Sequence, residues 1–415
     1  MVLGYRHQPW KGLYLCYDFL GTLFVRVPLW FLFSIPRSWR PRFSWSIKQT
    51  LLVQIFRHVV VDVMDQTGPI FPVPDHRVLK DGPAVNGVWI DPVPDDLIVG
   101  RLRTWAFVAS VSPIRVPGYW YFKNNDHKPM PTDPVSPGEK ILYTFHGGSY
   151  ISESSSPSGI STNIVRGLFQ HVDKVTRVFA VEYRLSTTAP LEPANPFPAA
   201  LIDALTGYYY LVHTCGISPN DVLISGDSAG GNLALALTRY LVDYSHTFQS
   251  LYPSLDHRSP SHSIIPGSLL LLSPWCDIGL SHDVPRSTAL LVADFDPEPQ
   301  GMDYAKQAYV GPFGMGAADM NEYISPSSRH PYFSASFKHF PKTLIVAGGA
   351  ENLLPQIKLL RDRMIRDIGN DGEGDGKVVY YEAEDACHDF LLFAWTEPAR
   401  SDTWQVIARW LEAES

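Results

Sequence analysis

A serine set among glycines, between a short apolar run and an apolar helical pattern, is the feature that most constrains the fold of this chain. The run Asp221–Ser225 reads as a buried strand and leads into Gly226-Asp227-Ser228-Ala229-Gly230-Gly231. The helical pattern Asn232–Leu237 follows directly. A turn this tight requires glycine, or a residue nearly as small, two positions before and two positions after the serine. The pattern is typical of a nucleophile elbow, although glycine and serine also mark ordinary turns.

The elbow interpretation assigns a task to each residue of the turn. The turn raises the hydroxyl of Ser228 above the sheet, and the N–H of Ala229 points toward the reacting oxygen. We therefore expect Ser228 to be the nucleophile and Ala229 to donate one hydrogen bond. Gly226, Asp227 and Gly230 are expected to shape the turn itself.

A second glycine motif lies upstream of the elbow. The run Ile141–Phe145 reads as a buried strand that ends in His146-Gly147-Gly148-Ser149. In α/β-hydrolases a loop of this HGGG type supplies further N–H donors for the oxyanion, because glycines let the backbone approach a carbonyl group closely. We expect Gly148 and Ser149 to donate, Gly147 to form the turn and His146 to organise the loop. The alternative is a glycine-rich loop without a chemical task.

Three further segments lie between or after these motifs. Between them, Val181–Leu185 and Phe197–Ala204 read as YRL followed by FPAALxDA, and Leu272–Asp277 reads as an SPW-x-D strand end. In combination these motifs resemble the hormone-sensitive-lipase family of α/β-hydrolases, from about residue 138 to the end of the sequence. In the first 135 or so residues, Arg6–Pro9 and Ile35–Pro41 look like segments of fungal members of that family.

The resemblance implies an α/β-hydrolase fold, with a mostly parallel central sheet flanked by helices and with a helical cap. The residues agree, since continuous apolar runs separated by helical patterns are typical of a parallel sheet covered on both faces. Two early strands are predicted at Val88–Ile90 and Gly118–Phe122. The later runs are Val178–Val181, Val222–Ile224, Leu269–Leu272 and Leu344–Val346.

The chain divides into four predicted parts. Residues 1–135 hold cap or membrane-interface helices, with a helix at Ile47–Met64, and the first strands. Residues 136–280 form the first half of the catalytic core, and residues 336–415 form the second half. Between the two halves, residues 281–335 lack the alternation of strand and helix patterns. We interpret them as a cap insertion that contains a helix at Asp303–Tyr309.

A nucleophilic serine requires a base, which an acid orients, and in this fold the chain order is serine, acid, histidine. His388 is the predicted base because it follows the strand-like run Val378–Ala383 and a short loop, and precedes an apolar helix start. Members of the resembled family usually carry glycine at the next position, where this chain has Asp389. The other histidines after the elbow lie in polar loops or in the expected cap: His246, His257, His262, His282, His330 and His339.

The acid is predicted at Glu351, which follows the strand and glycine turn Thr343–Ala350. The resembled family usually has Asp-Pro-Leu at this point, and a glutamate can orient an imidazole equally. Three rivals close to His388 are Glu384, Asp385 and Asp389. They rank lower because near neighbours in a chain often cannot fold a carboxylate back onto the ring. A solvated carboxylate in a first helical turn remains the structural alternative for Glu351.

These residues together predict a serine carboxylic-ester hydrolase, with Ser228, His388 and Glu351 as the triad and an acyl-enzyme intermediate. Its substrate would be a small ester with an apolar acyl part. No metal or organic cofactor is expected, since the sequence has no phosphate-binding loop, no H-E-x-x-H and no cysteine pair at zinc spacing. The alternative is a biosynthetic enzyme of secondary metabolism that performs acyl transfer, lactone chemistry or condensation. A non-catalytic receptor is disfavoured because serine, histidine and donor loop all persist.

The composition of the chain limits which classes of partner and which cellular compartment are expected. The formal net charge of −8 argues against nucleic acid as the main partner, and 18% charged residues leave room for a lipid-facing patch. The four cysteines show no spacing typical of a disulfide framework: Cys16, Cys215, Cys276 and Cys387. The sequence also has no N-x-[ST] glycosylation sequon. Reduced thiols in an intracellular, cytosolic-type environment are therefore expected. Cys387 as a competing nucleophile is disfavoured because the predicted base is its direct neighbour.

The segment Gly12–Phe33 is very apolar but is interrupted by Asp18, Arg26 and Pro28. A spanning helix needs about 20 mostly apolar residues, and a signal peptide needs a cleavage site of small residues, which is missing. Tryptophans and basic residues surround the segment, as in helices that lie in a membrane interface. We therefore expect residues 12–48 either to form cap helices over the active site or to contact a membrane surface, leaving the protein cytoplasmic or membrane-associated.

Overall fold

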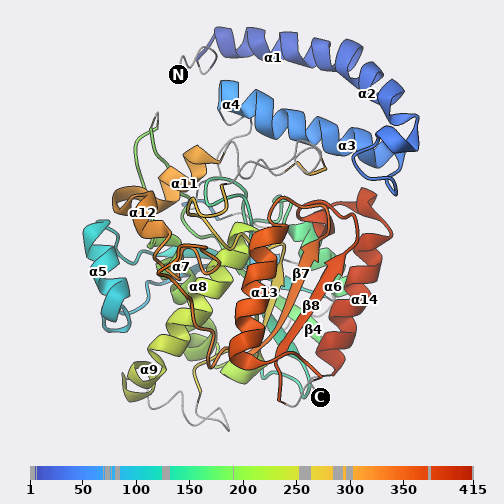
Figure 1. Cartoon of the computed structure of the whole chain (residues 1–415). Coiled ribbons are helices and arrows are strands. Elements are labelled where there is room, and N and C mark those ends of the chain that lie inside the picture. The colour runs from blue at the N-terminus through green and yellow to red at the C-terminus, as the bar shows by residue number, and fades with distance from the viewer. Residues whose placement is uncertain are drawn as a thin grey trace.

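The predicted strands form one eight-stranded sheet in the computed structural model (Figure 1). The strand order is β1-β2-β4-β3-β5-β6-β7-β8; β2 runs antiparallel to both of its neighbours, and every other pair is parallel. The expectation of a mostly parallel sheet is therefore confirmed. The strands are β1 Val85–Ile90, β2 Val116–Phe122, β3 Lys140–Phe145, β4 Val175–Val181, β5 Val222–Asp227, β6 Ser268–Leu272, β7 Lys342–Gly348 and β8 Val378–Ala383.

The structure describes residues 5, 7–68, 70, 75, 77–79, 85–123, 131–189, 191–251, 263–283, 293–295, 302–372 and 375–413. Among the predicted positions, Arg6, His257 and His262 lie outside these residues. The same holds for residues 284–292 and 296–301 of the expected cap insertion.

Helices cover both faces of the sheet, and successive strand residues pack on opposite sides because side chains alternate along a strand. In β3, Ile141 and Tyr143 join the larger core with α7, α8 and α13, while Leu142 joins the second core with α6 and α14 (Figure 1). These helices are α6 Thr162–His171, α7 Ala199–Tyr209, α8 Ala229–Asp243, α13 Leu354–Ile368 and α14 Ala399–Glu412. Peripheral helices are α5 Gly100–Val108, α9 Ser245–Leu251, α11 Asp303–Val310 and α12 Met315–Ala318.

A buried ion pair explains why the YRL and FPAALxDA segments occur together. The guanidinium of Arg184 donates to Asp203 Oδ1 from Nη2 at 2.8 Å, and the Arg184 backbone N–H donates to Oδ2 at 2.8 Å. The Asp203 side chain is fully buried. Removing either partner would leave an unpaired buried charge, which costs about 3–5 kcal/mol. The pair therefore fixes the start of α7 against the end of β4.

The N-terminal residues form a separate helical layer, here called the N-terminal helical hairpin (Figure 1). Its first arm is a continuous bent helix made of α1 Trp10–Gly21, a π-helical turn at Thr22–Arg26 and α2 Val27–Ser34. Its second arm is α3 Ile47–Arg57, a π-helical segment at His58–Val63 and α4 Met64–Thr67. The helix predicted at Ile47–Met64 is thus present, with its middle widened into π-helix.

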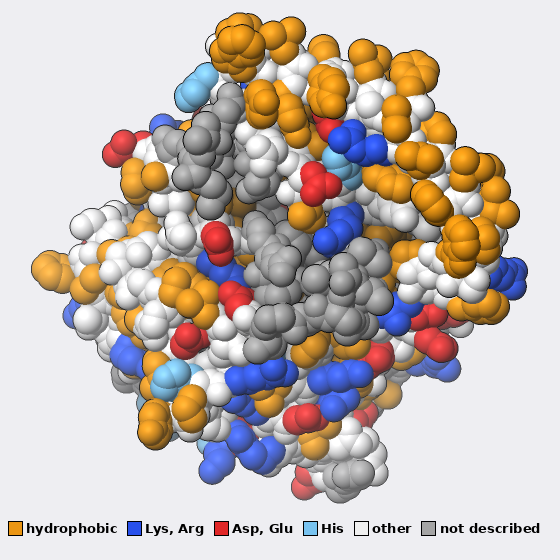
Figure 2. All heavy atoms as spheres, turned by 45° about the horizontal axis from the view of Figure 1, so that its top comes forward, with side chains coloured by type: hydrophobic (Ala, Val, Ile, Leu, Met, Phe, Trp, Pro, Cys, Tyr) orange, Lys and Arg blue, Asp and Glu red, His pale blue; other side chains and the backbone are white. Residues whose placement is uncertain are grey.

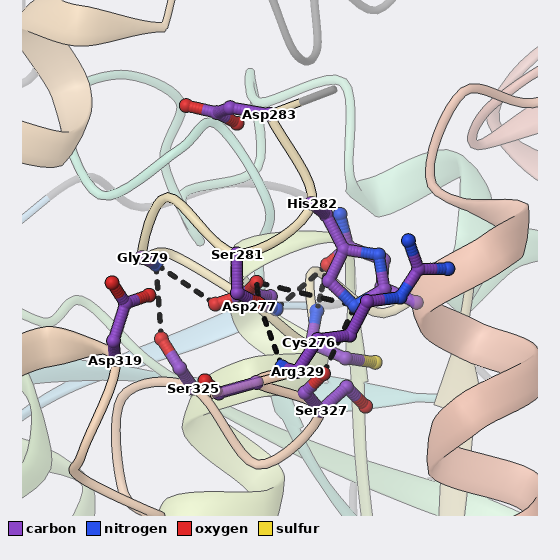
Figure 3. Close-up of polar contacts among 12 residues, drawn as sticks. Cys276, Asp277, Gly279, Ser281, His282, Asp283, Asp319, Ser325, Ser327 and Arg329 are labelled. Carbon is purple, nitrogen blue, oxygen red and sulfur yellow. Dashed lines mark hydrogen bonds and ion pairs between the residues drawn. The ribbon is translucent and has the colours of Figure 1, made fainter. Parts of the chain in front are cut away.

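The segment after β6 is fastened to the far end of the insertion by a buried polar network (Figure 3). Asp277 accepts hydrogen bonds from the Gly279 N–H at 3.0 Å and from the Ser281 hydroxyl at 2.5 Å. The Nε2 atom of His282 lies 2.9 Å from the carbonyl oxygen of Ser327, so this nitrogen donates. The two ends of the predicted insertion therefore meet at its base. Its role as a cap stays a prediction.

Candidate active site

The elbow has the backbone geometry that the glycine pattern predicts. Ser228 follows β5 directly and has φ +51° and ψ −117°, outside the regions that most residues adopt. Two hydrogen bonds hold this conformation: Ser228 N–H donates to Leu272 O at 3.0 Å, and Trp275 N–H donates to Ser228 O at 2.9 Å. A Cβ atom on Gly226 would lie 2.1 Å from the carbonyl oxygen of Gly230, so a larger residue would break the turn.

Three side chains from distant parts of the chain meet above the sheet. Ser228 Oγ lies 3.0 Å from His388 Nε2, and His388 Nδ1 lies 3.0 Å from Glu351 Oε2. Ser228 follows β5, Glu351 follows β7 and His388 follows β8, so all three lie at the carboxyl ends of parallel strands. All three residues are buried. The structure therefore brings together the three residues predicted from sequence.

Glu351 is held by both of its oxygens. Oε1 accepts the Gly348 N–H at 2.8 Å, while Oε2 faces His388. Burial raises the pKa of Glu351, and the hydrogen bond from His388, its charge and the Gly348 N–H oppose that rise. The carboxylate thus has a fixed orientation, which is what a residue that aligns an imidazole requires.

Of the three rival acids, only Asp389 contacts the imidazole within the described part of the chain. Its Oδ2 lies 3.2 Å from Nε2, the nitrogen that also faces Ser228, and not from Nδ1. Asp385 instead accepts hydrogen bonds from the Ser44 hydroxyl and, through its carbonyl oxygen, from the Trp45 indole. The position that orients Nδ1 is therefore filled by Glu351. Asp389 has φ +47°, a left-handed conformation that favours glycine, which the resembled family usually carries there.

Asp227 links the elbow to the donor loop. Its Oδ2 accepts the Gly147 N–H at 3.0 Å, so this donor is engaged and does not face a substrate. Burial raises the pKa of Asp227 well above its usual range, and the charge of Asp389 adds to the rise. Gly147 thus lies in the turn with its N–H engaged by Asp227, which leaves this N–H unsuited to donate to an oxyanion.

The backbone after Gly147 turns back on itself. Gly148, Ser149 and Tyr150 have φ of +91°, +56° and +63° in succession, and the Gly148 carbonyl accepts the N–H of residue 152 at 3.0 Å. In the part of the chain that the structure describes, the N–H groups of Gly148, Ser149 and Ala229 donate to no other group of the protein. These three donors are available to a ligand.

His146 is part of the scaffold and not a second base. It is buried, stacks on Tyr183 with ring centroids 4.2 Å apart, and its Nδ1 lies 2.8 Å from the Gly147 carbonyl oxygen. Burial lowers its pKa to about 4, so the ring is neutral near pH 7. The Tyr183 hydroxyl also donates to the His146 carbonyl at 2.7 Å. This supports the expectation that His146 organises the donor loop.

Asp294 is a residue of the site that sequence reasoning missed. Its fully buried carboxylate accepts the His388 N–H at 2.9 Å through Oδ1 and the Asn352 N–H at 2.7 Å through Oδ2. One carboxylate therefore fastens the loop that carries the histidine to the loop that carries Glu351. A single aspartate in an irregular insertion has no motif around it, and only the three-dimensional contact identifies it.

The sequence of residues 142–392 matches the profile of the Abhydrolase_3 family, described as alpha/beta hydrolase fold. An esterase of Acinetobacter venetianus is 28% identical over 267 residues, which are 63% of this chain and 71% of that protein. An acetyl-hydrolase of Streptomyces hygroscopicus is 29% identical over 163 residues, or 38% of this chain and 44% of that protein. The second match thus spans less than half of its relative.

Solved structures share the fold. An esterase/lipase from an uncultured bacterium superposes with a TM-score of 0.54 at 20% identity, over 89% of this chain and 99% of that chain. A hormone-sensitive lipase from a metagenome library gives a TM-score of 0.50 at 24% identity, over 81% of this chain and 88% of that chain. At this identity the likeness concerns the arrangement of the backbone.

Proposed function

Because the chain belongs to the Abhydrolase_3 family, which has the alpha/beta hydrolase fold, we propose that it is a serine hydrolase of carboxylic esters with Ser228, His388 and Glu351 as its catalytic triad. The observation that carries the proposal is the pair of 3.0 Å contacts that link the hydroxyl, the imidazole and the carboxylate in series. Membership also confirms the resemblance to the hormone-sensitive-lipase family. The likeness of the first residues to fungal members stays a prediction.

The proposed reaction follows from this series of contacts. Ser228 Oγ bonds to the carbonyl carbon of the ester while His388 Nε2 takes its proton, and Glu351 stabilises the imidazolium that forms. The oxyanion accepts hydrogen bonds from Gly148, Ser149 and Ala229. His388 then gives the proton to the alcohol as the carbon–oxygen bond breaks, which leaves an acyl-enzyme. Water, deprotonated by His388, releases the acid and frees Ser228.

The names of the relatives support the ester as the substrate class. One similar protein is called an esterase and another an acetyl-hydrolase. No step of the proposed reaction needs a metal or an organic cofactor, because serine, imidazole and backbone N–H groups supply the nucleophile, the proton transfers and the oxyanion donors.

We expect the purified protein to release p-nitrophenol from p-nitrophenyl acetate and butyrate with water as the only acceptor. The acid product, measured by titration, should equal the nitrophenol in amount. The biosynthetic alternative makes the opposite prediction, since an acyl-transfer enzyme would stall as acyl-enzyme until an alcohol or amine acceptor is added. A single burst of nitrophenol without turnover, restarted by an acceptor, would favour transfer over hydrolysis.

We further propose that residues 12–48 contact a membrane surface at an intracellular site. Within the described residues, one helix, Trp10–Ser34, is long and apolar enough to cross a membrane. It contacts the second arm of the hairpin at Asp18 and Trp30, both of which contact His58. A helix that contacts its own protein on one side and is otherwise exposed fits a position in the membrane interface better than a lone span. The four cysteines, which are free thiols, fit an intracellular site.

This attachment predicts that the protein floats with phosphatidylcholine vesicles that contain phosphatidylserine in a density gradient. The double variant Tyr17→Glu/Phe24→Glu should remain in the dense fractions, because it places two charges on apolar positions that are 72% and 69% exposed. The control is Phe107→Glu/Tyr332→Glu, which changes two aromatic residues outside the hairpin that are still more exposed, at 85% and 88%. Equal flotation of all three proteins would contradict the attachment.

A further inference from the structure

The outer face of the first arm of the hairpin is apolar along its whole length. We define it by Leu13, Tyr17, Leu20, Phe24 and Phe31, all of which are exposed on the first arm. Figure 2 shows hydrophobic side chains gathered along the rim that α1 and α2 form. Soluble proteins seldom expose so long a contiguous apolar surface, and one of this extent marks an interaction site.

The charged residues that interrupt the first arm in sequence turn away from this outer face. Asp18 pairs with Arg26 at 3.0 Å on the same arm and with His58 Nε2 at 3.1 Å on the second arm. His58 Nδ1 lies 2.7 Å from Asp62, so the imidazole sits between two carboxylates. Asp18 and Arg26 are thus paired on the side of the first arm that faces the second arm. The outer face can enter an apolar phase without carrying an unpaired charge with it.

The identity of the covering phase follows from the residues at the end of the first arm. Trp39 and Phe43 are 65% and 67% exposed, and the guanidinium of Arg37 lies 5.9 Å from the Phe43 ring. Exposed tryptophan and arginine next to a long apolar helix are typical of the membrane–water interface, where the aromatic ring sits at headgroup level. The occupant that fits this face is therefore a lipid bilayer with anionic headgroups.

The hairpin lies against the loop that carries His388. Phe56 of α3 packs on Phe393 at 5.3 Å and on Phe295 at 6.0 Å between ring centroids, and Phe295 lies 6.1 Å from the His388 ring. A packed cluster of aromatic rings therefore connects the hairpin to the histidine. The surroundings of His388 on this side are thus apolar and aromatic, and they suit an acyl chain better than a charged group.

Polar contacts fix the hairpin in this place. The Trp45 indole donates to the Asp385 carbonyl at 2.7 Å, three residues before His388. Arg57 donates to the Asp294 carbonyl at 3.2 Å, and the Asp294 carboxylate holds the His388 N–H. The outer face and the proposed active site therefore keep a fixed relation, with both on the side of the sheet where the strands end.

From these contacts we infer that the substrate is an apolar ester dissolved in a lipid bilayer, which reaches Ser228 from the membrane on which the N-terminal helical hairpin lies. This inference rests on the proposed function. A bilayer that lies on the outer face concentrates an apolar ester close to the hairpin, whose second arm packs on the aromatic cluster beside His388. A water-soluble ester does not depend on membrane binding, so it should react at the same rate whether or not the outer face binds a bilayer.

The experiment compares two esters in the full-length protein. The first is p-nitrophenyl butyrate in buffer, and the second is 4-methylumbelliferyl palmitate dissolved in vesicles of phosphatidylcholine and phosphatidylserine. For Tyr17→Glu/Phe24→Glu we expect the rate on the vesicle-borne ester to fall by about tenfold or more, since losing two buried aromatic contacts weakens vesicle binding by about a hundredfold. Its rate on the soluble ester should stay within about twofold, and Phe107→Glu/Tyr332→Glu should match the wild type on both.

The other outcomes distinguish a failure of bilayer delivery from a failure of the proposed hydrolase function. Equal rates of wild type and variant on the vesicle-borne ester would overturn bilayer delivery while leaving the hydrolase intact. If the wild type does not hydrolyse the soluble ester, that result would instead overturn the proposed function. If the charged variant melts well below the wild type, Tyr17→Gln/Phe24→Gln is measured in its place. A wild type that buries this face in a dimer, detected by chemical cross-linking with vesicles present, would assign the face to a second copy and overturn the inference.

Discussion

Replacing Ser228 with alanine is expected to lower kcat on p-nitrophenyl acetate by about 10⁶, to the level left by binding and the oxyanion donors alone. The change removes one oxygen, the one that lies 3.0 Å from His388 Nε2. It leaves the elbow in place, because both backbone hydrogen bonds of residue 228 are kept and alanine meets the same positive φ as serine. Steady-state kinetics and covalent labelling with a fluorophosphonate measure the effect, and the label should disappear.

The control for this variant is Ser328→Ala, which removes a hydroxyl that is just as buried but lies in the loop at the base of the insertion. Its rate and labelling should equal those of the wild type. Labelling that survives in Ser228→Ala would identify another nucleophile. Cys387 is poorly suited to that part, because burial raises the pKa of its thiol well above the usual value and disfavours the reactive thiolate.

The sequence predicts those parts of the fold and the site that depend on local steric demands. Gly226 and Gly230 are required because a Cβ atom there would lie 2.1 Å from a carbonyl oxygen. Such demands leave a pattern of glycines that can be read without coordinates. The same is true of continuous apolar runs, which specify buried parallel strands, and of the Arg184–Asp203 pair, whose partners fall in adjacent motifs.

Contacts between residues far apart in the chain leave no such pattern. Nothing around Asp294 indicates that it binds the backbone of His388, 94 residues away. Trp45 and Asp385 are 340 residues apart, and no sequence pattern indicates their contact either. Asp18 and Arg26 read as interruptions of an apolar helix, whereas in three dimensions they pair with each other and Asp18 also pairs with His58. Periodicity gives the kind of residue at a position but not its distant partner.

Replacing Glu351 with glutamine should lower kcat by about 10⁴, with little change in KM. The Gly348 N–H donates to Oε1 at 2.8 Å, so in the variant the amide oxygen is kept at that position and the amide NH₂ faces His388 Nδ1. Nδ1 must then accept, which places the ring proton on Nε2, where it cannot take the proton of Ser228. The variant thus holds the imidazole in the wrong tautomer, in addition to losing the negative charge.

Stability should respond in the opposite sense, and this separates orientation of the base from a purely structural role. Burial raises the pKa of Glu351, so its ionised form is costly in the folded state, and a neutral side chain of the same shape should leave the melting temperature equal or higher. Asp389→Asn is the matched comparison, since it neutralises the carboxylate on the other nitrogen of the same ring. A small loss of kcat in Glu351→Gln together with a large one in Asp389→Asn would transfer the role of the acid to Asp389.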